Sequence, residues 1–76
     1  SETPNMENLA LMLKLGGRIK MIRKKKNLTQ IRLASGCGVQ KSSISKIEAG
    51  LANPTVFTLY KISNMLKVHM VELFKG

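Results

Sequence analysis

Two short helical segments flank a turn rich in glycine in the middle of the chain. Thr29 has a side chain typical of a helix N-cap and predicts a helix that continues to about Ser35. Residues 36–39 hold two glycines and predict a tight turn, and residues 41–49 predict the second helix, with two isoleucines on its inner side. Two helices joined by a short turn that contains glycine form the helix-turn-helix pattern.

Apolar residues on both sides of this pair also recur at helical spacing. Leu15, Ile19 and Ile22 follow one another at intervals of four and three, which predicts a helix that Asn27 ends. Residues 6–14 continue the pattern towards the N-terminus, and we expect a bend at the adjacent glycines 16 and 17, because glycine destabilises a helix interior. The other expected helices are residues 55–66, with Thr55 as the N-cap, and one short turn at residues 70–74.

No stretch alternates with a period of two, so the chain is predicted to be all-α. We expect a compact bundle of about five short helices around a central helix-turn-helix. Residues 1–14 are assigned to an N-terminal tail and helical extension, and residues 15–76 to the helix-turn-helix domain.

The charge of the chain points to an anionic partner. There are 13 Lys and Arg residues against 4 Asp and Glu residues, so the formal net charge is +9. Residues 16–50 carry nine of these bases and the single acid Glu48. The run Lys24, Lys25, Lys26 is compatible with a solvated helix end, but a basic segment of this length favours a polyanion such as nucleic acid.

Several classes of function are disfavoured by composition. One cysteine, Cys37, and one histidine, His69, are too few for a zinc site, and no cofactor is expected. The few carboxylates and the short chain argue against an enzyme. The apolar runs are too short to cross a membrane, so we expect no membrane association and a cytoplasmic location.

Five sequence motifs together resemble the phage-repressor and Cro-like (Xre-type) helix-turn-helix family. They are Leu15-Gly16-x-Arg18-Ile19-Lys20-x-Ile22-Arg23, Leu28-Thr29-Gln30-x-x-Leu33-Ala34, Gly38-Val39, Ile44-Ser45-x-Ile47-Glu48-x-Gly50 and Asn53-Pro54-Thr55. The resemblance covers about residues 15–74. It implies a lambda-repressor-like fold and a bacterial or phage DNA-binding protein.

The resemblance also implies roles for individual residues. It places the helix over residues 40–49 in the DNA major groove, where Lys, Gln and Ser side chains can bind base edges. A structural ion pair is implied between Arg23 and Glu48. This chain has Gln40 where the family usually has Ser or Thr, so the N-cap of that helix is expected to be weaker. The implied base-reading residues are Gln40, Lys41, Ser42, Ser45 and Lys46, and the implied phosphate contacts are Arg18, Lys20, Gln30, Ser43 and Asn53.

We therefore expect a DNA-binding transcriptional regulator that occupies a palindromic operator as a homodimer. Two surfaces are candidates for the dimer interface: Phe57, Val71 and Phe74 near the C-terminus, which we favour, and Leu9, Met12 and Leu13 near the N-terminus. The alternative is an antitoxin-like or adaptor protein that docks a protein partner through the N-terminal apolar residues and binds DNA only secondarily.

Overall fold

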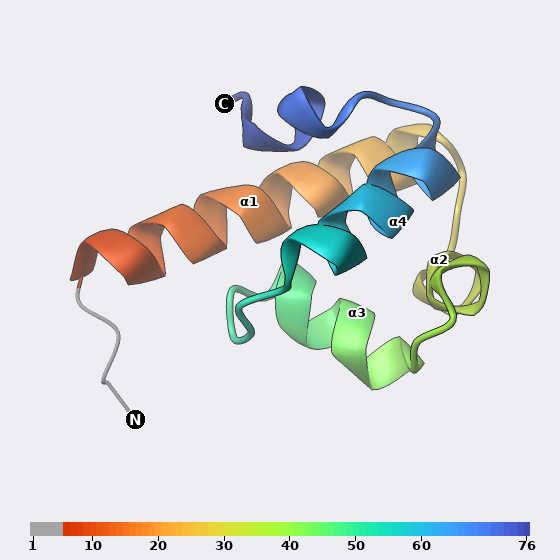
Figure 1. Cartoon of the computed structure of the whole chain (residues 1–76), viewed down its shortest axis with the longest axis horizontal. Coiled ribbons are helices and arrows are strands. Elements are labelled where there is room, and N and C mark those ends of the chain that lie inside the picture. The colour runs from red at the N-terminus through yellow and green to blue at the C-terminus, as the bar shows by residue number, and fades with distance from the viewer. Residues whose placement is uncertain (1–5) are drawn as a thin grey trace.

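A computed structural model describes residues 6–76, which form helices and connecting loops without a strand. The elements are α1 (Met6–Lys25), α2 (Gln30–Cys37), α3 (Lys41–Glu48), α4 (Val56–Leu66) and a short 3-10 helix, η1 (Met70–Phe74). Figure 1 shows α1 running along the length of the molecule, with η1 on one of its sides and α3 on the other. The expected all-α architecture is confirmed.

The bend expected at the two central glycines is not found, because α1 continues through both of them as one helix of 20 residues. Gly16 is buried against the last turn of α3, and a Cβ atom at this position would collide with the carbonyl oxygens of Ile47 and Glu48. Gly17 faces open space. The first glycine therefore permits close packing between two helices, and it does not interrupt the helix that contains it.

The caps expected around α2 and α4 are confirmed. The Thr29 hydroxyl accepts a hydrogen bond from the Arg32 backbone N–H at 3.1 Å, and the Thr55 hydroxyl accepts one from the Thr58 N–H at 3.1 Å. Asn27, which ends α1, adopts the left-handed conformation with φ of 60°. Each N-cap satisfies a backbone donor that the helix itself leaves without a partner.

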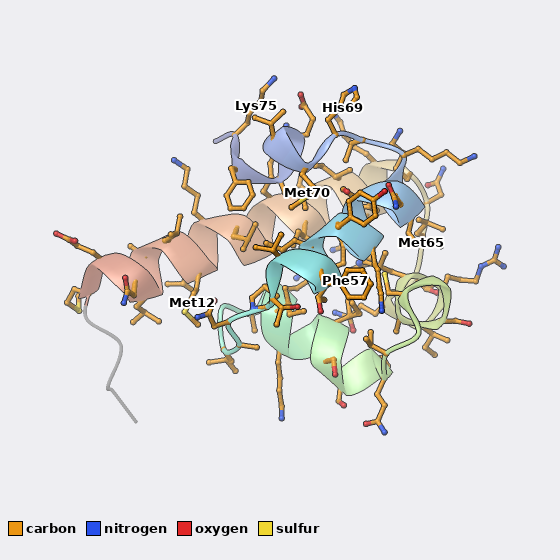
Figure 2. All side chains as sticks on the ribbon, in the orientation of Figure 1. Met12, Phe57, Met65, His69, Met70 and Lys75 are labelled. Carbon is orange, nitrogen blue, oxygen red and sulfur yellow. The ribbon has the colours of Figure 1, made fainter. Side chains whose placement is uncertain are left out.

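The turn between α2 and α3 is shorter than expected. Gly36 is not part of it, because α2 continues to Cys37 and the turn begins with Gly38, whose φ of 68° suits a residue without a side chain. Gly36 instead lies against the Met65 side chain, which extends from α4 towards α2 (Figure 2). Gln40 precedes α3 and makes no side-chain cap hydrogen bond, as expected for a weaker N-cap.

One apolar core joins all five helices. Its most deeply buried members include Ile19 from α1, Leu33 from α2, Ile44 from α3 and Ile62 from α4. Leu73 of η1 is also fully buried, so the short C-terminal helix is part of the core. The complete set is Leu15, Ile19, Ile22, Leu33, Ala34, Cys37, Ile44, Ile47, Leu59, Ile62, Leu66 and Leu73.

Candidate nucleic-acid interface

The exposed face of α3 carries the residues assigned to base reading. Ile44, Ile47 and Glu48 are buried and define the inner side of the helix. Successive residues of an α-helix are rotated by about 100° around its axis, so Ser42 and Lys46 lie almost opposite this inner side. All five candidates are exposed: Gln40, Lys41, Ser42, Ser45 and Lys46. Two hydroxyl groups, two ammonium groups and one amide group therefore project into solvent from α3 and from its N-cap residue.

A buried ion pair fixes α3 to α1. The Arg23 Nε donates to Glu48 Oε2 at 2.6 Å and its Nη2 donates to Glu48 Oε1 at 3.0 Å, which is the bidentate geometry typical of strong arginine–carboxylate pairs. The two side chains are only 8% and 3% exposed. Arg23 Nη1 also donates to the Leu28 carbonyl at 2.8 Å, so the pair spans α1, α3 and the loop before α2.

Gln30 extends this network to α2, a link that the sequence did not reveal. Its Nε2 donates to Glu48 Oε1 at 3.0 Å, although the two residues are 18 positions apart in the chain. An amide nitrogen carries two hydrogens, so one N–H remains to donate elsewhere. Gln30 is also the first residue of α2, where backbone N–H groups and the helix dipole favour an anion.

Three of the other residues assigned to phosphate contacts are exposed. Ser43 is on α3 and Asn53 is in the loop between α3 and α4. Lys20 is exposed on α1, four residues after Gly16, so it lies on the side of α1 that packs against α3. These positions are compatible with a DNA backbone that follows α3.

Arg18 is not brought to this face. It lies two residues after Gly16, about 200° further round the helix, and therefore on the far side of α1 from α3. Its Nε donates to the Glu72 carbonyl at 2.8 Å and its Nη2 to the Glu72 carboxylate at 3.4 Å. The structure therefore places Arg18 apart from the other residues assigned to phosphate contacts, and its guanidinium holds η1 against α1.

Cys37 and His69 have no place at this interface. Cys37 is in the core, and burial raises the pKa of its thiol, with a smaller opposing effect from Lys61. A protonated, enclosed thiol is a packing residue. His69 precedes η1 and makes no side-chain cap hydrogen bond. Within residues 6–76, the His, Cys, Asp and Glu side chains form no group that could hold a metal ion.

The apolar residues assigned to a dimer interface are exposed but do not form one patch. Phe57 is 66% exposed at the start of α4, with Lys61 Nζ 4.5 Å from the centre of its ring. Val71 and Phe74 are 60% and 48% exposed in η1. Figure 2 shows Phe57 well apart from η1.

The N-terminal half of α1 carries further exposed apolar residues. Of the three residues proposed there, Leu9 and Leu13 are exposed and Met12 is half-buried on the side of α1 away from η1 (Figure 2). Leu11, which the sequence reasoning did not single out, is 56% exposed. No helix in the described part of the chain is both long and apolar enough to cross a membrane.

Comparisons with known proteins agree with this geometry. The transcriptional regulator SlrR of Bacillus subtilis is 44% identical over 61 residues, which are 79% of this chain and 40% of SlrR. The restriction-modification controller protein C.AhdI from Aeromonas hydrophila superposes with a TM-score of 0.84 at 31% identity, over 86% of this chain and 98% of C.AhdI. SinR, the biofilm master regulator solved in complex with DNA, superposes with a TM-score of 0.75 at 40% identity, over 80% of this chain and 98% of that chain.

A family model described as helix-turn-helix matches residues 19–73, which include α2, α3 and the buried ion pair. The named relatives include a phage immunity repressor and several transcriptional regulators. The chain spans less than half the length of SlrR. These matches show that the chain belongs to the Xre-type helix-turn-helix family of transcriptional regulators.

Proposed function

We propose that this chain binds a palindromic DNA operator as a homodimer, with α3 in the major groove, and regulates transcription from the adjacent promoter. The observation that carries the proposal is the exposed polar face of α3, held rigidly by the buried Arg23–Glu48 pair. Lys46 and Lys41 would donate to guanine O6 and N7, Gln40 would pair with adenine, and the two serines accept either base type.

The phosphate backbone would be bound around this helix. Gln30 offers one amide N–H and the N-terminus of α2, and Glu48 holds its side chain in place. Lys20, Ser43 and Asn53 are exposed and would add contacts that fix the position of the protein without reading sequence. Arg18 is left out of this set because it binds Glu72.

Dimerisation is proposed because a single α3 reads too few base pairs to select one site in a genome. A two-fold dimer would place two α3 helices about 34 Å apart, on half-sites whose centres are about 10 base pairs apart. The proposed contacts for this dimer remain Val71 and Phe74 on η1 and, as a separate patch on α4, Phe57. SinR, which has a similar fold, was solved in complex with DNA, and this supports the DNA-binding part of the proposal.

The proposal is tested by selecting bound duplexes from a random pool and measuring their affinity. We expect an inverted repeat, and removal of one half-site should weaken binding much more than removal of flanking bases. Affinity should fall steeply with salt, because phosphate contacts release counterions. A selected site without two-fold symmetry, bound equally well as a single half-site, would overturn the homodimer model.

A further inference from the structure

A stripe of three exposed side chains runs along the N-terminal half of α1. Glu7, Leu11 and Lys14 follow one another at intervals of four and three residues, so they share one face of the helix. Leu11 is 56% exposed, and the two charged residues are also exposed. An acid, a large apolar residue and a base therefore stand in a row on the surface.

This stripe faces away from the proposed DNA interface. Gly16, which packs against the end of α3, lies roughly 170° round the helix from the centre of the stripe. Arg18 follows on the same face of α1 and binds Glu72 of η1. The Lys14 side chain lies beside Gly76, which follows η1. Figure 1 shows η1 and α3 on opposite sides of α1, in agreement with this placement.

The order of charges along the stripe is self-complementary. In an antiparallel pair of α1 helices, the two-fold axis midway between positions 7 and 14 would pass between Ala10 and Leu11. Each Glu7 would then face Lys14 of the second copy, and the two Leu11 side chains would meet near the axis. The two ion pairs would be about 10 Å apart along the helix, with the apolar contact between them.

We propose that this stripe is an interface at which a second copy of the chain binds, with the two α1 helices antiparallel. A two-fold contact uses the same patch on both molecules, and this patch matches its own rotated copy. A chain with a net charge of +9 repels itself, and residues 6–13 carry Glu7 and no lysine or arginine. The stripe, with one acid and one base, carries no net charge of its own, so self-association is less opposed here than along the basic segment 16–50.

The contact goes beyond the operator dimer. The proposed operator dimer uses exposed residues of η1 and α4, whereas this contact uses the N-terminal half of α1. The stripe would instead join two DNA-bound units.

Charge exchange within the stripe tests the proposal. Glu7→Lys and Lys14→Glu each convert both attractive pairs into repulsive ones, so each variant alone should associate at least about tenfold more weakly than wild type in low salt. An equimolar mixture of the two variants restores both pairs and should associate like wild type. Sedimentation equilibrium in low and high salt measures this, and equal association of wild type, single variants and mixture would overturn the pairing.

Cross-linking gives a second measurement that does not depend on charge. Leu11→Cys places a thiol near the proposed axis and should form a disulfide-linked dimer under mild oxidation. Leu13→Cys, which is 52% exposed on another face of the same helix turn, is the matched control and should cross-link far less. Equal cross-linking of both variants would contradict the geometry. Half-site affinity is measured separately on the same proteins, so a failure of DNA binding would count against the proposed function alone.

Discussion

Replacing Glu48 with glutamine should destabilise the fold strongly, because it leaves the Arg23 charge buried without its counter-charge. The carboxylate is 3% exposed and accepts hydrogen bonds from both Arg23 and Gln30. Removing one partner of such a buried pair costs about 3 to 5 kcal/mol. The total stability expected for a domain of this length is about 4 to 11 kcal/mol, so the variant loses a large share of it.

Thermal unfolding followed by circular dichroism measures this loss. For a domain of this size, 1 kcal/mol shifts the midpoint by about 4 to 8 °C, so Glu48→Gln should lower it by more than about 12 °C. The matched control is Glu72→Gln, whose carboxylate pairs with Arg18 and Lys75 but is 32% exposed. Solvent screens an exposed pair, so this control variant should shift the midpoint far less. Equal shifts for the two variants would refute the claim that burial sets the cost.

Three further predictions concern backbone conformation and pH. Gly16→Ala should lower the unfolding midpoint markedly because the new Cβ meets the α3 carbonyls, whereas Gly17→Ala, which faces open space, should raise it slightly; the reverse order would contradict the packing. Replacing Lys67, whose φ is 58°, with glycine should raise the free energy of unfolding by up to about 1 kcal/mol. A lower free energy of unfolding in urea would count against backbone strain at this position. The hydrogen bond from Lys75 lowers the pKa of Glu72. The stability that ionised Glu72 contributes is therefore present above the pKa of the unfolded state and is lost as the pH falls through the pKa of the folded state. Glu72→Gln should make the unfolding temperature depend less steeply on pH in the acid range.

The helices and caps could be predicted because their signals are local. Thr29 and Thr55 cap the segments that follow them, and the apolar spacing of α2, α3 and α4 reports a single buried face. Gly16 could not be interpreted in this way. From the sequence, Gly16 is only a residue that weakens a helix. A glycine is needed there because the backbone of Ile47 and Glu48, 31 and 32 positions away, packs against it.

The exposure of a candidate site residue could be predicted where it follows from that residue's own helix, but not where tertiary contacts decide. Lys41 and Lys46 face outward because Ile44 and Ile47 face inward. Arg18 carries the same charge as Lys20, and only the position of η1 shows that it serves a structural contact. The link between Gln30 and Glu48 likewise depends on how α2 and α3 cross.

The ratio of affinities for the selected operator and for a scrambled duplex of the same length tests the central claim, that the outer face of α3 reads sequence. In Lys46→Ala, we predict that this ratio falls by about ten-fold or more, since a base contact is worth about 1 to 3 kcal/mol of discrimination. In Lys20→Ala, both affinities should fall together and the ratio should stay constant. A constant ratio in Lys46→Ala, or an equal fall in both variants, would contradict the assignment of α3 as the reading helix.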